Sequence, residues 1–257
     1  MKDTMRLALL ALVLTGALAG PAAAQPGPPM LTVYAAADLA FAFKEIVPLF
    51  EHSTGVKVTL VLGSTGNLAI QIEHGAPADV FFAADQSFVD GLRSRGVVMP
   101  GTESLYAQGR IVLATSKTAG VAVRDLADLG KTEVRRVAIA NPAHAPYGRA
   151  AQQALEATGL WERLRAKLVY GENIRQTLQF IQTGAVEAGI VALSVADVPE
   201  VRYVPIDPKL HRPLNQMAVV VKRSASPELG VAFIQFLNGP EGRPVMKRLG
   251  FLLPGEF

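Results

Sequence analysis

Apolar positions along this chain follow two different periods in turn. Short apolar runs without alternation, such as 80–84 and 137–140, are typical of strands that are buried on both faces of a sheet. Between such runs, apolar residues recur at helical spacing, as at Leu39, Phe43 and Ile46. Strand and helix patterns that alternate in this way predict an α/β fold in which parallel strands are joined by crossover helices.

The individual elements can be assigned from the same pattern. Strands are expected at residues 31–35, 56–62, 80–84, 110–114, 137–140, 167–170, 188–193 and 216–221. Helices are expected at residues 39–54, 67–74, 87–95, 124–129, 146–157, 174–183, 227–238 and 241–249. Pro48 falls inside the first helix, so we expect it to kink that helix or to end its regular hydrogen-bond ladder.

The number of strands bears on the domain organisation. A single sheet of this many strands would be wide for the length of the chain, so we expect two lobes. Lobe 1 is predicted to contain residues 25–108 together with 218–257, and lobe 2 to contain residues 109–217. Connecting strands near Arg110 and near Val219 would form a hinge between them.

Residues 1–24 have the pattern of a secretory signal peptide. Lys2 and Arg6 give a basic start, Leu7–Leu18 is apolar, and three alanines precede Gln25. The apolar run is too short to span a bilayer, so we expect cleavage rather than a membrane anchor. In a bacterium, such a signal peptide predicts export to the periplasm.

Composition then excludes several classes of function. The chain has no cysteine, which excludes disulfides, thiol catalysis and zinc–thiolate sites. The formal net charge is only +3 and the basic residues are scattered, which argues against a nucleic-acid surface. The four histidines lack metal-ligand spacing. We therefore expect that the protein binds no nucleic acid and no cofactor. We also expect the chain to be monomeric.

Several loops share one design, in which a strand ends, a small or polar residue follows, and a helix begins. They are residues 36–38, 64–66, 145–147 and 172–174. Such loops gather at the carboxyl ends of parallel strands, where α/β proteins bind ligands. Pro146 fits the first helical position, which leaves the amides of Tyr147 and Gly148 without helical partners. Amides at the positive end of a helix dipole make an anion site.

Each feature taken alone also fits a plainer interpretation. The loop before Pro146 fits an ordinary strand-to-helix turn, and Ser64 and Thr65 fit a helix cap. A loop histidine such as His144 is more often a packing residue than a ligand. Asp79 and Asp85 flank a buried strand, where turn and capping roles are commoner than acid–base catalysis.

Five ordered sequence blocks resemble one known family, the periplasmic molybdate-binding proteins of ABC transporters. The blocks are Ala35–Leu39, Gly63–Asn67, Gly75–Asp85, Asn141–Gly148 and Gly189–Leu193. The resemblance covers essentially all of the chain after residue 24. It implies a two-lobed, type II-like periplasmic-binding-protein fold, with two mixed, mostly parallel sheets flanked by helices and a ligand cleft between the lobes. It also implies a protein that binds molybdate, and tungstate with it, and delivers the oxyanion to a membrane permease without catalysis.

The resemblance also implies a set of oxyanion contacts. They fall on the turn at Ala37 and Asp38, the hydroxyls of Ser64 and Thr65, and the backbone amides of Tyr147 and Ile174. No residue is expected to ligate the metal atom directly. The side chain of Tyr147 is expected to matter little, because its contribution would be the amide.

The chain departs from the family pattern at two positions. Some members have a tyrosine donor where Ala192 stands, and many have Ser or Asn where Asp38 stands. Two unit charges about 4 Å apart repel by about 4 kcal/mol at an effective dielectric constant of about 20, so an ionised Asp38 would oppose a dianion. We therefore interpret Asp38 as an N-cap, with its carboxylate turned onto the amides of its own helix.

Two alternatives remain at the level of sequence. The first is a receptor of the same fold for sulfate or another tetrahedral oxyanion, because helix-start amides recognise charge and shape. The second is an exported enzyme on a two-lobed fold. An enzyme is poorly supported, because Ser64 and Ser194 have no identifiable histidine partner and no nucleophile-elbow sequence.

Overall fold

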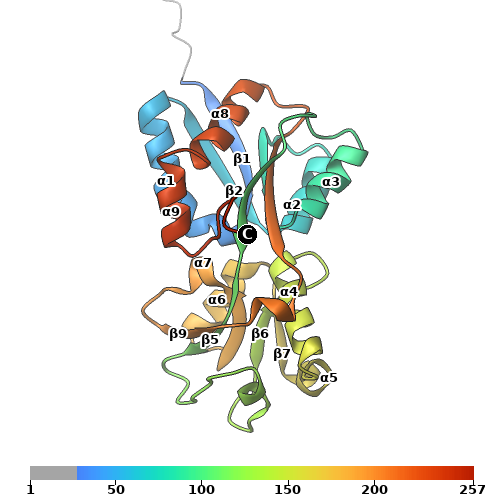
Figure 1. The fold of residues 1–257 in the computed structure, drawn as a ribbon, viewed down its shortest axis with the longest axis vertical. Helices are drawn as coiled ribbons and strands as arrows, with labels where there is room; N and C mark the ends of the chain where they lie inside the picture. Colours follow the sequence, from blue (N-terminus) through green and yellow to red (C-terminus); the bar gives the residue numbers. More distant parts are fainter. Residues whose placement is uncertain (1–27) are drawn as a thin grey trace, which may run out of the picture.

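The computed structural model describes residues 28–257, which form two α/β lobes, one above the other in Figure 1. The signal peptide expected at residues 1–24 lies outside the described residues. Each lobe is built on one five-stranded sheet. The expected α/β class, with two mixed, mostly parallel sheets and flanking helices, is confirmed.

The sheet of the first lobe has the strand order β2-β1-β3-β10-β4. Its strands are β1 (Met30–Ala36), β2 (Lys57–Gly63), β3 (Val80–Ala83), β4 (Ser104–Gly109) and β10 (Leu214–Val220). Strands β2, β1 and β3 are parallel, whereas β10 is antiparallel to both of its neighbours. The register places Ala36 of β1 beside Gly63 of β2, so these two strands end together.

The sheet of the second lobe repeats this arrangement with the order β7-β6-β8-β5-β9. Its strands are β5 (Ile111–Ser116), β6 (Val137–Ala140), β7 (Leu168–Gly171), β8 (Ala188–Ala192) and β9 (Val201–Pro205). Here β5 is the strand antiparallel to both neighbours. The parallel pair β6 and β7 ends together at Ala140 and Gly171.

Helices cover the faces of both sheets. Those of the first lobe are α1 (Ala40–Thr54), α2 (Thr65–Glu73), α3 (Gln86–Ser94), α8 (Pro227–Leu237) and α9 (Gly242–Arg248). Those of the second are α4 (Pro146–Ala157), α5 (Trp161–Leu164), α6 (Ile174–Gln182) and α7 (Leu193–Ala196). Short 3-10 turns are η1 (Ala37–Leu39), η2 (Ala127–Gly130), η3 (Arg165–Lys167) and η4 (Pro208–Leu210). Helix α1 continues through Pro48 to Thr54, so the proline does not end it. No helix of residues 28–257 is both long enough and apolar enough to cross a membrane.

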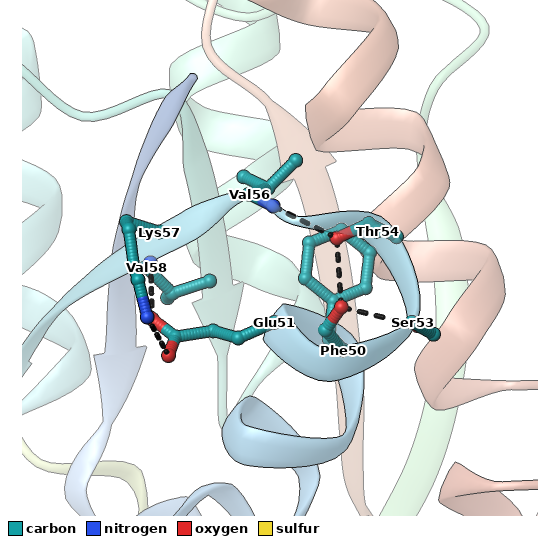
Figure 2. Close-up of polar contacts among 7 residues, drawn as sticks. All are labelled: Phe50, Glu51, Ser53, Thr54, Val56, Lys57 and Val58. Atoms are coloured by element: carbon teal, nitrogen blue, oxygen red, sulfur yellow. Dashed lines mark hydrogen bonds and ion pairs between the residues drawn. The ribbon is translucent and has the colours of Figure 1, made fainter. Parts of the chain in front are cut away.

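The connection from α1 to β2 shows how local chemistry sets an element boundary (Figure 2). Gly55 adopts a left-handed backbone with φ 71° and its N–H donates to the Glu51 carbonyl at 2.9 Å. The Thr54 hydroxyl donates to the Phe50 carbonyl at 2.7 Å. The Glu51 carboxylate then accepts from the Val58 N–H at 2.8 Å. These bonds end the helix and hold the start of β2 against it.

Over residues 28–257 the chain crosses between the lobes twice. It passes directly from β4 to β5 through Arg110, and it returns between β9 and β10. The boundary predicted between residues 217 and 218 falls inside β10, whose pairing from Leu214 onward lies wholly in the first sheet.

Strands β4 and β9 were not predicted, and both lie at the outer edge of their sheets. Edge strands have one unpaired side, so they need no continuous apolar run. Strand β9 accordingly carries exposed Arg202 and Tyr203.

Candidate functional site

The predicted site residues meet in a small space between the lobes. The lining residues are Ala36, Ala37, Asp38, Gly63, Ser64, Thr65, Ala84, Ala145, Pro146, Tyr147 and Ile174. The space between them is small, about 10 Å³, against about 580 and 440 Å³ for two hollows on the outside of the second lobe. All six residues that the resemblance implied are therefore brought together around one small space.

Topology explains why these residues converge. The turn at Ala37 follows β1 and the start of α2 follows β2, while α4 and α6 follow β6 and β7. These strands are adjacent parallel pairs, one pair in each sheet. We call Ala37, Asp38, Ser64 and Thr65 the first wall, and Tyr147 and Ile174 the second wall.

Hydroxyl groups distinguish the first wall. Ser64 is the residue before α2, but its side chain makes no capping bond; its Oγ instead lies 2.8 Å from Nδ1 of His144 in the other lobe. Thr65 Oγ1 accepts from the Ala84 N–H at 3.1 Å, which leaves the hydroxyl hydrogen free to donate. Both residues are buried. The helix-cap interpretation of the Ser64 hydroxyl is therefore wrong.

Backbone amides at two helix starts make the second wall. Helix α4 begins at Pro146, as predicted, and its Arg149 N–H is already bonded to the Ala145 carbonyl at 3.1 Å. The earlier amides of Tyr147 and Gly148 have no place in the helical ladder. Gly148 is required here, because a Cβ atom would overlap the Ala140 carbonyl oxygen.

Helix α6 presents one amide in the same way. The Asn173 side chain caps the helix by accepting from the N–H groups of Arg175 at 3.0 Å and Gln176 at 3.1 Å. The Ile174 N–H precedes both of these groups and does not donate to the capping side chain. The two predicted second-wall amides thus lie at the positive ends of two helices.

The carboxylate of Asp38 does not cap its helix, contrary to the interpretation from sequence. Neither η1 nor α1 has a side-chain cap, and the carboxylate lies near the amides of Asp38 and Leu39 without a well-aligned hydrogen bond. Its Oδ2 instead accepts from the Tyr147 hydroxyl at 2.9 Å and from Nε2 of Gln216 at 2.8 Å. A cap requires only a local contact, whereas this network joins Gln216 of the first lobe and Tyr147 of the second.

Burial dominates the electrostatics of Asp38, which is only 1% exposed. Desolvation raises the pKa of this carboxyl from its ordinary 3.8 to about 6, although the hydrogen bonds from Gln216 and Tyr147 lower it in part. Burial and the negative charge of Asp38 also raise the pKa of Tyr147 well above its ordinary value. The phenol therefore stays neutral and acts as a donor.

Gln216 and the side chain of Tyr147 are functional candidates that sequence reasoning missed. Nε2 of Gln216 donates both to Asp38 and to the Tyr147 hydroxyl, the latter at 2.8 Å. Gln216 is fully buried on β10. A glutamine at the start of an otherwise apolar run was the one signal, because a buried amide needs polar partners.

Further contacts join the two lobes at the rim of the site. The Gly66 N–H donates to the His144 carbonyl at 2.8 Å, and Asn67 donates to Glu172. Two arginines of the second lobe lie over phenylalanine rings of the first, Arg149 over Phe88 at 4.8 Å and Arg175 over Phe41 at 4.5 Å. The lobes therefore enclose the site in this structure.

The other acidic candidates have structural roles. Asp79 accepts from the Thr32 N–H at 2.8 Å and from the Ser224 hydroxyl at 2.7 Å. Asp85 caps α3 through the Ser87 N–H and pairs with Arg149 at 3.4 Å. Among residues 28–257, histidine and acidic side chains form no group of three that could hold a metal ion.

Two lobes that enclose a small space lined by helix starts define the architecture of a two-lobed solute-binding protein. The family model for bacterial extracellular solute-binding proteins matches residues 31–252, and the chain belongs to this family. The molybdate-binding protein ModA of Rhodobacter capsulatus is 37% identical over 253 residues, which is 97% of each chain. The expected resemblance is confirmed, and the chain is a solute-binding protein rather than an enzyme.

Solved structures agree with this assignment. The periplasmic molybdate-binding protein of Azotobacter vinelandii has a TM-score of 0.82 and 31% identity, covering 87% of this chain and 99% of that chain. The sulfate-binding protein SubI of Mycobacterium tuberculosis has a TM-score of 0.75 at 15% identity, covering 88% of this chain and 87% of that chain. The second likeness shows a shared fold alone.

Proposed function

We propose that this protein captures molybdate, and tungstate with it, in the periplasm and delivers the oxyanion to an ABC permease. The observation that carries the proposal is the convergence of both walls on one small space between the lobes. Relatives named as molybdate-binding proteins, at 37% and 31% identity over most of the chain, support the choice of ligand. The monomeric chain would need no cofactor and would reach the periplasm after cleavage following Ala24.

Binding would proceed by closure of the two lobes on the anion. The hydroxyls of Ser64 and Thr65 would donate from the first wall, and the amides of Tyr147 and Ile174 from the second. Each hydrogen bond to a charged group contributes roughly 1.5–3 kcal/mol, so a few such bonds give tight binding without lysine or arginine in the site. Because the anion would bridge both walls, it would stabilise the closed form that the permease recognises.

Calorimetric titration with sodium molybdate, tungstate and sulfate tests the choice of ligand. Molybdate and tungstate should bind with similar affinity and raise the melting temperature with concentration, whereas sulfate should bind far more weakly. Equal or tighter sulfate binding would contradict the proposal in favour of a sulfate receptor.

A variant of the first wall tests the location of the site. Thr65→Val removes a hydroxyl donor and leaves the Ala84 N–H unpaired, so molybdate affinity should fall about 10- to 100-fold. Thr183→Val is the matched control, because this exposed hydroxyl lies at the end of α6 and bonds the Gln179 carbonyl. Equal affinities for the two variants would place the ligand elsewhere.

A further inference from the structure

Asp38 has one carboxylate oxygen that is satisfied and one that is not. Oδ2 accepts from both Tyr147 and Gln216, at 2.9 and 2.8 Å. Oδ1 is buried and makes no well-aligned hydrogen bond among residues 28–257, although the amides of Asp38 and Leu39 lie near the carboxylate. Asp38 nevertheless lines the space between the lobes. A buried oxygen without a partner is costly, so its partner is expected to arrive with the ligand.

Within the described residues 28–257, no cation pairs with this carboxylate. The Tyr147 and Tyr106 hydroxyls are the titratable groups beside it, and burial keeps the pKa of both phenols well above the ordinary value. Among the elements that pack against Asp38, α7 and β10 carry no charged residue. Helix α6 carries only Arg175, which lies over Phe41.

The remaining charged side chains near this part of the fold are engaged or exposed. Lys44 and Glu45 of α1 are exposed, and Arg149 of α4 pairs with Asp85. His144 of the loop before α4 bonds Ser64 and lies 3.8 Å from Glu172. An anion entering the space would therefore meet an uncompensated carboxylate, unless that carboxylate takes up a proton.

We infer that Asp38 is protonated when an oxyanion occupies the cleft, and that its Oδ1–H donates a hydrogen bond to the ligand, so that binding takes up one proton from solvent. The inference rests on the proposed function and deepens it. The proton belongs on Oδ1, because Oδ2 already accepts two donors. A neutral Asp38 presents an acceptor to Tyr147 and Gln216 and a donor to the ligand, as an asparagine would.

The expected consequence is a binding affinity that depends on pH. The pKa of Asp38 is about 6 in the closed form without ligand, so affinity for a dianion should fall by up to about tenfold per pH unit above that value. Asp38→Asn supplies the same donor without titrating. This variant should bind with an affinity independent of pH, and more tightly than the natural chain at pH 8.

The experiment is calorimetric titration with sodium molybdate from pH 6 to pH 8, in pairs of buffers that differ in ionisation enthalpy. At pH 7.5 the natural chain should take up close to one proton per ligand, and Asp38→Asn close to none. The control is Asp90→Asn on α3, whose carboxylate pairs with Arg93 on the surface and which should behave as the natural chain.

Three results would overturn the inference. The first is molybdate binding by the natural chain without proton uptake, a result that needs no variant and leaves the proposed function intact. The second is an Asp38→Asn protein that keeps the full pH dependence, which would assign the proton to another group. The third is the absence of binding to any oxyanion at any pH, which would overturn the proposed function as well.

Discussion

The two walls of the site face the same space but are built from different parts of the chain. The first wall presents side chains, the hydroxyls of Ser64 and Thr65 and the carboxyl of Asp38. The second wall presents backbone amides at the starts of α4 and α6. Its side chains reach across instead, as Tyr147 does to Asp38. Side-chain substitutions therefore test the contribution of the first wall to affinity directly. The contribution of the second wall should change mainly when the position of its backbone changes.

The largest effect is expected from Gly148→Ala in the second wall. The added Cβ atom would overlap the Ala140 carbonyl, so the start of α4 must shift. The amide N–H groups there would then no longer point toward the ligand. We expect a loss of affinity on the order of 100-fold and destabilisation of about 1–3 kcal/mol. Titration calorimetry and thermal melting measure both.

The control for that prediction is Gly91→Ala in α3, where the nearest atom to a Cβ is the flexible end of Arg95 at 3.4 Å. Affinity there should be unchanged, with stability equal or slightly higher because alanine favours helix. If Gly148→Ala binds as well as Gly91→Ala, backbone position does not govern the second wall.

The next largest effect concerns the one buried carboxyl of the first wall. Because its pKa rises from 3.8 unfolded to about 6 folded, the contribution of Asp38 to stability is fully present below pH 3.8 and is lost as the pH rises through 6. Asp38→Asn should therefore raise the unfolding free energy by about 3 kcal/mol at pH 8 and by little at pH 4. Denaturant unfolding without ligand at both pH values checks this, and equal gains at both would contradict it.

A smaller effect is expected where a side chain of the second wall meets the first. Tyr147→Phe keeps the amide but removes the donor to Asp38 and the acceptor for Gln216, so affinity should fall about 3- to 10-fold. The expectation from sequence, that this side chain matters little, did not anticipate the network. Tyr170→Phe on β7, at a residue that is 45% exposed, is the control and should bind normally. Identical affinities would show that the network does not support closure.

The smallest effect is expected at the exposed rim. Glu172→Gln weakens the contacts with Asn67 and His144 that join the lobes. Exposed pairs contribute about 0.2–1 kcal/mol, so affinity should change less than about fivefold, and less still at high salt. Glu162→Gln removes a comparable exposed pair with Arg165, away from the lobe contact, and should have no effect on binding. A large loss of affinity in Glu172→Gln would show that the second lobe contributes to binding mainly through its rim contacts and not through the amides of the second wall.

The sequence by itself determined most of the elements and the loops that converge on the site, and the resemblance to a known family implied the six contact residues. Buried strands such as β3 and β6 are apolar along their whole length, and α4 begins at a proline. Both are local signals. Parallel strands of one sheet end at the same edge, so the order of the loops was enough to predict that they converge. Strands β4 and β9 were missed because polar residues interrupt their apolar runs, Ser104 and Gln108 in β4 and Arg202 in β9.

The tertiary structure alone decided what the side chains of the site do. Asp38 bonds Gln216 and Tyr147, which are 178 and 109 residues away along the chain, and Ser64 bonds His144 across 80 residues. From sequence, a local helix cap is as good an explanation of the Asp38 carboxylate as this network. Local patterns carry no information on contacts between residues that are distant along the chain. Burial at that closure removes water from the carboxylate, and this desolvation sets its pKa.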